Sequence, residues 1–177
     1  MKLNMKYSIL AFLAAAVLVI LDQITKYLAA MHLAVGHGGA DIVLWEGVFR
    51  LQYLENRGAA FGIMQGQKAI LVAVTCVIVF LLCWIFIRLP MDKRFHALRC
   101  LITFVLAGAV GNFIDRMRFG YVVDFFYFEL IDFPVFNVAD IYVTCSVILF
   151  VIFFLFYYKD EDFERVWAAI WPFKKGK

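Results

Sequence analysis

Residues 111–140 read GNFIDRMRFGYVVDFFYFELIDFPVFNVAD and place carboxylates, asparagines and an arginine among strongly apolar segments. Three of its aspartates, Asp115, Asp124 and Asp140, are expected near the boundary of a lipid bilayer. An ionised side chain is unfavourable there unless it is paired, hydrated or needed for chemistry. These acids are therefore the first candidates for a functional site.

The composition of the whole chain is typical of an integral membrane protein. Hydrophobic residues make up 65% and charged residues 18% of the 177 residues, which is more apolar surface than a soluble core of this size can bury. The net charge is only +3 and the basic residues are dispersed, so no nucleic-acid partner is expected. The four cysteines lie in apolar segments without metal-ligand spacing, and we expect buried thiols.

Four apolar runs are long enough to cross a bilayer as helices. The predicted spans are residues 7–27, 69–87, 98–114 and 138–158. The first run is also compatible with the core of a signal peptide, but no small-x-small cleavage site follows it, so we predict a retained span. In the third run, Gly108 and Gly111 form a small-x-x-small pair that favours close helix packing.

Between the first two spans, residues 36–66 are expected to form a small β-rich element outside the membrane. Residues 42–53 (IVLWEGVFRLQY) have the β-branched and aromatic content of short strands, with Glu46-Gly47 as a turn. Residues 55–62 (ENRGAAFG) place polar groups beside small residues, which indicates either a peptide-binding loop or a plain turn. The tail, residues 159–177, is expected to form an interfacial helix.

The basic residues predict how the spans are oriented. Lysines and arginines gather at the N-terminus, at residues 88–99 and in the tail, and such segments face the cytoplasm. The predicted fold is therefore a mainly α-helical integral membrane protein with four spans, both termini cytoplasmic and a small extracytoplasmic β-element. Asp22 and Asp140, at the ends of spans one and four, then share the outer face with residues 115–137.

The chain offers few groups for nucleophilic or metal-assisted hydrolysis. It has two serines, Ser8 and Ser146, and its three histidines have no metal-ligand spacing. A serine nucleophile and a zinc site are thus poor candidates, and we predict no metal and no cofactor. Carboxylates remain as the chemical groups of the outer face.

Asp124 and Asp140 are the most suitable pair for acid-base chemistry. Neither has a lysine or arginine within five residues, so neither is neutralised locally. Two close carboxylates that share one proton supply a base and an acid and titrate as a unit. The alternative for Asp140 is a stabilising charge at a helix N-terminus.

Two further acids have basic neighbours. Asp115 is followed by Arg116, which favours an ion pair or a helix-end contact. Asp22 precedes Lys26 by one helical turn. That pair is either a terminal salt bridge with a snorkelling lysine or a support for the polar site from a neighbouring helix.

Five motifs, in order along the chain, resemble those of the bacterial lipoprotein signal peptidases, also called signal peptidase II. They are DQITK (22–26), NRGAAFG (56–62), GNFIDR (111–116), VVDF (122–125) and FNVAD (136–140). The resemblance implies one peptidase domain over residues 1–177, in the bacterial cytoplasmic (inner) membrane, with its active site at the extracytoplasmic face.

The resemblance also implies an activity and its residues. The expected enzyme is an aspartic endopeptidase that removes the signal peptide from prolipoproteins, cleaving on the N-terminal side of a diacylglyceryl-modified cysteine. The catalytic dyad falls on Asp124 and Asp140. The supporting positions fall on Asn56, Asn112, Arg116, Asn137, Asp22 and Asp115. The implied partners are prolipoprotein signal peptides, membrane lipids and the inhibitory cyclic lipopeptide globomycin.

Two other classes of protein also carry acids in apolar segments. A small proton-coupled carrier would use them as relays, but the chain has no inverted repeat and its acids gather at one face. A structural assembly factor would use no chemistry, and it predicts that Asp124→Asn and Asp140→Asn leave function intact.

Overall fold

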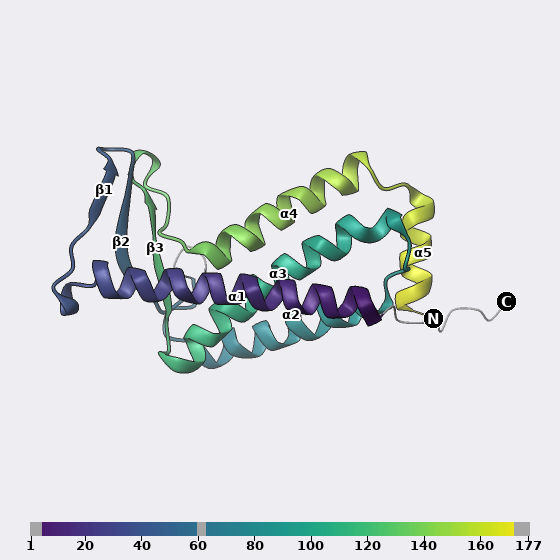
Figure 1. Ribbon diagram of the computed structural model, residues 1–177, viewed down its shortest axis with the longest axis horizontal. Helices are drawn as coiled ribbons and strands as arrows, with labels where there is room; N and C mark the ends of the chain where they lie inside the picture. The colour runs from purple at the N-terminus through teal and green to yellow at the C-terminus, as the bar shows by residue number, and fades with distance from the viewer. Residues whose placement is uncertain (1–4, 60–62, 172–177) are drawn as a thin grey trace.

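The computed structural model describes residues 5–59 and 63–171, which form a helical bundle with one small sheet (Figure 1). The helices are α1 (Met5–Leu33), α2 (Lys68–Arg88), α3 (His96–Arg118), α4 (Val138–Phe156) and α5 (Asp160–Ile170). The strands are β1 (Ile42–Trp45), β2 (Phe49–Asn56) and β3 (Val122–Phe128), and short 3-10 helices lie at Val35–His37, Lys93–Phe95 and Glu129–Ile131. The end of the NRGAAFG motif, residues 60–62, and tail residues 172–177 lie outside the described residues.

Helices α1 to α4 are each long and apolar enough to cross a membrane. The prediction of four spans is therefore confirmed for the part of the chain that the structure describes. Many large apolar side chains point out of the bundle, among them Phe12 at 73% and Phe156 at 83% exposure, as lipid contact requires. The four cysteines are exposed too. Our expectation of buried thiols is wrong, because these apolar segments face lipid and not a protein core.

Two helices are longer than the predicted spans. Helix α1 continues to Leu33, although the sequence suggested an end at residue 27, and α3 continues to Arg118 instead of residue 114. In both cases we took polar residues for the end of a span. They lie on the helix and point into the protein, so Asp115 belongs to α3 and not to a loop.

The sheet stands at one end of the bundle and α5 crosses the other end (Figure 1). Helix α1 begins at the α5 end and α4 finishes there, as an even number of spans requires. The start of α4 and the ends of α1 and α3 lie toward the sheet. The polar motifs at those helix ends therefore meet beside the strands.

The sheet has the order β1-β2-β3, with both pairs antiparallel. The β1–β2 hairpin, which turns at Gly47 with φ +67°, confirms the two predicted strands. Strand β3 was not predicted, because we assigned residues 115–137 to a loop. Its register pairs Asn56 with Val122 and Leu54 with Asp124, so β3 brings the NRGAAFG and VVDF motifs together.

Helix α5 is fixed to the bundle by charged and apolar contacts. Arg94 contacts Asp162 at 2.8 Å, and the Nε of Arg88 donates to the carbonyl oxygen of Ala169 at 2.8 Å. Phe163 packs on an apolar cluster that includes Phe95. The tail thus forms the predicted helix, and its location at a membrane interface stays a prediction.

The glycines of α3 allow close contact with two other helices. A Cβ atom at Gly108 would lie 2.5 Å from the carbonyl oxygen of Ala139 on α4. A Cβ atom at Gly111 would lie less than 3.0 Å from the Oδ2 atom of Asp22 on α1. The small-x-x-small pair therefore packs α3 within one molecule, as its spacing predicted.

Gly111→Ala should destabilise the protein. The added methyl group would meet the carboxylate of Asp22, which is fully buried and ion-paired, so α1 and α3 must separate. Overpacking of this kind reduces the free energy of unfolding by about 1–3 kcal/mol. Thermal unfolding in detergent measures the loss. Gly36→Ala is the matched control, because its Cβ would meet no atom within 4 Å; equal midpoints for both variants would contradict the prediction.

Candidate active site

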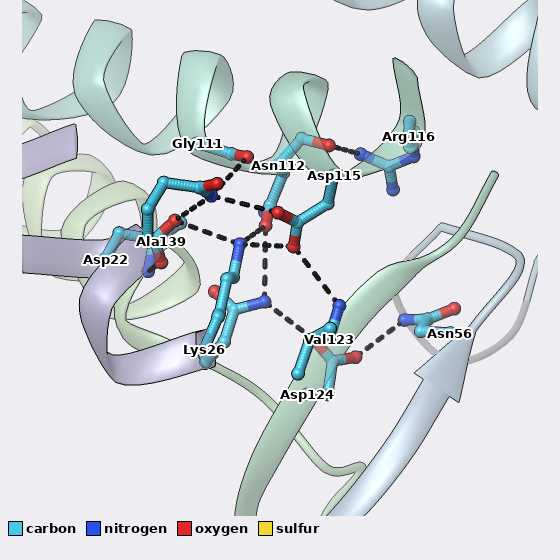
Figure 2. Close-up of polar contacts among 12 residues, drawn as sticks. Asp22, Lys26, Asn56, Gly111, Asn112, Asp115, Arg116, Val123, Asp124 and Ala139 are labelled. Atoms are coloured by element: carbon cyan, nitrogen blue, oxygen red, sulfur yellow. Dashed lines mark hydrogen bonds and ion pairs between the residues drawn. The ribbon is translucent and has the colours of Figure 1, made fainter. Parts of the chain in front are cut away.

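The Asp124 carboxylate is held by amide groups from two directions. Its Oδ2 atom accepts a hydrogen bond from Asn56 Nδ2 at 2.9 Å (Figure 2), and its Oδ1 atom accepts one from Asn137 Nδ2 at 2.6 Å. The side chain is 1% exposed. Strand β3 carries Asp124, β2 carries Asn56, and Asn137 caps α4, so the fold joins three distant segments here.

Asp140 lies in the first turn of α4 and forms a capping box with Asn137. Its backbone N donates to Asn137 Oδ1 at 3.0 Å, and its Oδ2 atom accepts from the backbone N of Asn137 at 3.1 Å. Its Oδ1 atom accepts from Asn112 Nδ2 at 2.8 Å. Asp140 therefore stabilises the helix start, as the structural alternative predicted, and also faces the cluster of asparagines.

Asn137 connects the two candidate catalytic acids. Its side-chain amide donates to Asp124 Oδ1, while its backbone amide donates to Asp140 Oδ2. Asn137 is completely buried, so water cannot compete for these bonds. One residue thus fixes both carboxylates relative to each other.

Lys26 is the centre of a buried ionic cluster next to these acids (Figure 2). Its Nζ atom lies 3.0 Å from a carboxylate oxygen of Asp22 and 3.0 Å from one of Asp115, and it donates to Asn112 Oδ1 at 2.8 Å. An ammonium group has three protons, and these contacts occupy all of them. Lys26 is 3% exposed. The snorkelling alternative is therefore wrong, because the lysine points into the protein.

Asp22 also holds the backbone beside Asp140. Its second oxygen, Oδ1, accepts a hydrogen bond from the backbone N of Ala139 at 2.9 Å. Ala139 immediately precedes Asp140 and is fully buried. Asp22 thus supports the polar site from a neighbouring helix, which was the second of the two predicted roles.

Asp115 holds the backbone beside Asp124 in the same way. Its Oδ2 atom accepts from the backbone N of Val123 at 3.2 Å, and its Oδ1 atom accepts from Gln23 Nε2 at 2.9 Å. The two acids that Lys26 neutralises therefore each fix the chain one residue before a candidate catalytic acid.

Arg116 has a different partner from the one that its sequence position suggested. Its Nη2 atom donates to the carbonyl oxygen of Gly58 at 3.0 Å, and its Nη1 atom lies 3.5 Å from the carbonyl oxygen of Asn112. Within the described residues it forms no ion pair with Asp115, which pairs with Lys26 instead. Arg116 thereby ties α3 to the segment that follows β2.

The structure brings every predicted site residue into one connected network. The network has two further members, Gln23 and Lys26, and the sequence analysis did not predict that these side chains point into the protein. A signal was present in the DQITK motif, because a lysine one turn from an aspartate inside a span is expected to be paired. The backbone amides of Val123 and Ala139 were also missed, since no sequence pattern marks them.

The environment of Asp124 changes its protonation. The pKa of its carboxyl group is raised from the ordinary 3.8 to about 7, chiefly because burial disfavours the charged form and secondly because Asp140 is a nearby like charge. Hydrogen bonds from Asn56 and Asn137 oppose the rise. Near neutral pH, the two carboxyl groups can therefore hold one proton between them, as an acid-base pair requires.

This raised pKa predicts that Asp124 lowers stability as the pH rises from about 4 to about 7. Over that range the folded carboxyl keeps its proton while the unfolded one has lost it, so raising the pH favours the unfolded state. The effect is at most about 4 kcal/mol. Asp124→Asn removes it, so the difference in thermal midpoint between variant and wild type should move in favour of the variant across this range. A difference that does not change with pH would contradict the prediction.

Comparison with known proteins identifies similar chains. Residues 14–156 match the model of the family described as signal peptidase (SPase) II. The lipoprotein signal peptidase of Brevibacillus brevis is 46% identical over 77% of this chain and 88% of its own length. That of Clostridium tetani is 39% identical over 82% and 90%. A solved bacterial membrane enzyme at 1.9 Å resolution superposes with a TM-score of 0.71 at 34% identity, over 89% of this chain and 97% of that one.

Proposed function

The chain belongs to the signal peptidase II family, and from this premise we propose that Asp124 and Asp140 are its catalytic dyad. The enzyme is an aspartic peptidase that removes signal peptides from prolipoproteins. We also propose that the substrate carries a diacylglyceryl-modified cysteine and that the active site lies at the extracytoplasmic face of the membrane. We further propose that residues 1–177 form a single peptidase domain.

One observation carries the choice of dyad among the four aspartates of the polar network, Asp22, Asp115, Asp124 and Asp140. Asp22 and Asp115 are both ion-paired to Lys26. Asp124 and Asp140 form no ion pair among the described residues, and amide groups alone hold them. An acid-base pair must exchange a proton, which a carboxylate locked to an ammonium group does poorly. The geometry therefore favours Asp124 and Asp140.

The proposed reaction uses one shared proton. The ionised carboxylate removes a proton from water, whose oxygen forms a bond to the carbonyl carbon of the scissile peptide. The protonated carboxyl gives its proton to the leaving nitrogen as the C–N bond breaks, so the new N-terminal amine departs neutral. The pair keeps one proton throughout, now on the other carboxyl group, and transfer of that proton between the two carboxyl groups restores the starting arrangement. Burial of Asp124 supports this cycle, because it keeps one carboxyl protonated near neutral pH.

The supporting residues hold this pair in place. Asn112 and Asn137 donate to the carboxylates, and Asn56 donates to Asp124 from β2. We propose that these amides orient the acids, which gives the supporting positions implied by the resemblance a specific role. Arg116 holds the segment at Gly58, where it can also reach a carbonyl oxygen of the substrate.

The position of the dyad fits a substrate that lies partly in the membrane. Asp140 is at the start of the α4 span and Asp124 is on the adjacent sheet, so both lie at the sheet end of the bundle (Figure 1). We place this end at the extracytoplasmic face of the inner membrane, because residues 88–99 are basic and the tail carries Lys174, Lys175 and Lys177. A signal helix in the bilayer would then present its cleavage site at the depth of the dyad.

Cleavage of a defined substrate tests the proposed function. Purified protein in detergent is incubated with a prolipoprotein whose cysteine carries diacylglycerol, and mass spectrometry locates the cut. We expect cleavage on the N-terminal side of that cysteine, little cleavage of the same unmodified chain, and inhibition by globomycin. Equal cleavage of both chains would contradict the proposed substrate. A cut at another bond would contradict the proposed specificity.

A further inference from the structure

A cavity lies on the opposite side of β3 from the Asp124 side chain. Its volume is about 570 Å³, and the segments that line it are α1, the turn at Val35–His37, β2, β3 and the end of α3. Val123 lines it, whereas the next residue, Asp124, faces the asparagines, as alternation along a strand requires. Neither Asp124 nor Asp140 lines this cavity. The cavity therefore does not include the dyad, although it borders the ionic cluster of Lys26 and Asp115.

Two guanidinium groups flank a pair of aromatic rings, Phe119 and Tyr121, that line one wall of the cavity. The Arg118 guanidinium lies 4.9 Å from the ring centre of Phe119, and that ring stacks on Tyr121 at 5.8 Å. On the other side, Arg57 lies 5.3 Å from the ring centre of Tyr121. These contacts hold the cationic groups at fixed places beside the cavity.

The two arginines differ in their remaining partners. Arg57 is ion-paired with Glu55 at 2.8 Å. Arg118, which lines the cavity and is exposed, has no carboxylate partner in the parts of the chain that the structure describes. The three carboxylates on the cavity wall pair with other cations: Glu55 with Arg57, Asp41 with Arg50 at 3.6 Å, and Asp115 with Lys26. Arg118 thus remains available to an anion.

The position of Arg118 along its span indicates which kind of anion it binds. Arg118 is the last residue of the α3 span, and the end of a span is the part of a helix that meets the phosphate groups of a bilayer. Arginine binds phosphate through paired N–H donors. The hydroxyl groups of Tyr53 and Tyr121, which are hydrogen-bonded to each other at 3.4 Å, lie on the same wall. Beyond them the lining becomes apolar, with Ala30 and Leu33 of α1.

We propose that this cavity binds the phosphate headgroup of a membrane phospholipid, with Arg118 as the anion-binding residue. The site goes beyond the peptidase substrate, because a diacylglyceryl group carries no phosphate. Lys26 and Asp115 form part of the cavity wall. The headgroup therefore binds directly behind the ionic cluster that positions the dyad.

Lipid titration of the delipidated protein in a neutral detergent tests this site. The probes are short-chain phosphatidylglycerol and, separately, inorganic phosphate, with binding followed by calorimetry. We expect saturable lipid binding that Arg118→Gln weakens about tenfold, the value of one charge-assisted contact. Arg165→Gln, an exposed arginine on α5, is the matched control and should bind as wild type does. Cleavage of the prolipoprotein should be unchanged in Arg118→Gln without added lipid.

Ala30→Phe provides an independent variant, because it fills the cavity without changing charge. It should also weaken lipid binding, and it keeps the proposal testable if Arg118→Gln does not fold. Equal affinity in Arg118→Gln and wild type, or an equal loss in Arg165→Gln, would overturn the proposal. Binding of inorganic phosphate without binding of the lipid would overturn the headgroup as the source of the phosphate.

Discussion

Asp124→Asn and Asp140→Asn should each lower kcat by about 10⁴-fold, while the protein stays folded. Asparagine has nearly the same shape as aspartate, but it can neither take a proton from water nor give one to a leaving amine. The neighbouring amide donors, Asn56 and Asn137 at Asp124 and Asn112 at Asp140, lose at most part of their hydrogen bonding. Initial rates of prolipoprotein cleavage measure the effect, and thermal unfolding shows that each variant is folded.

The matched control is Asp132→Asn. Asp132 is an exposed aspartate at φ +47°, a conformation that asparagine tolerates well, and it accepts a hydrogen bond from Tyr127. Its loss should leave the cleavage rate within about twofold of wild type. If a folded Asp124→Asn variant still cleaves while a folded Asp115→Asn variant does not, the first member of the dyad has been chosen wrongly.

Lys26→Met should cause the largest loss of stability among single changes near the site. Methionine fills a similar volume, but it leaves the carboxylates of Asp22 and Asp115 buried without their cation. Removing one partner of a buried ion pair reduces the free energy of unfolding by about 3–5 kcal/mol. The variant should also cleave more slowly, because Asn112 loses the donor that turns its amide nitrogen toward Asp140.

Unfolding in denaturant and cleavage at low temperature measure these two effects. Lys93→Met is the control, since Lys93 is exposed, adjoins Arg94, which contacts Asp162 of α5, and has no ion pair in the described chain. The double variant Lys26→Met/Asp115→Asn removes one of the two carboxylates as well as the cation. Its loss in free energy of unfolding should be smaller than the sum of the losses in the two single variants. Additive losses would show that the three charges do not act as a cluster.

Hydropathy was sufficient to predict the four spans and the position of Asp140 at a helix start, because both depend on local composition. Strand β3 was not predicted, since residues 122–128 become a strand through pairing with β2, a partner more than sixty residues away in the sequence. The end of α1 was misplaced for a related reason. Composition does not distinguish a lysine that snorkels to water from one such as Lys26, which is paired inside the protein.

The candidate site was predicted more completely than the fold around it. Asp124 and Asp140 stood out because no basic residue lies near them in the sequence, and the structure extends this to three dimensions by pairing Lys26 with the other two acids. The sequence could not indicate how Asp22 and Asp115 support the site, because they act on the backbone amides of Ala139 and Val123. Such contacts exist only once α1, α3, α4 and β3 have packed.

The most direct measurement of the central claim is a kinetic cycle of wild type, Asp124→Asn, Asp140→Asn and the double variant on the diacylglyceryl-modified substrate. Two carboxyl groups that share one proton act as a unit, so losing both should be no worse than losing one. We predict that the double variant retains the same residual rate as either single variant. A double variant whose loss is the product of the two single losses, or a folded single variant with nearly full activity, would contradict a shared-proton dyad.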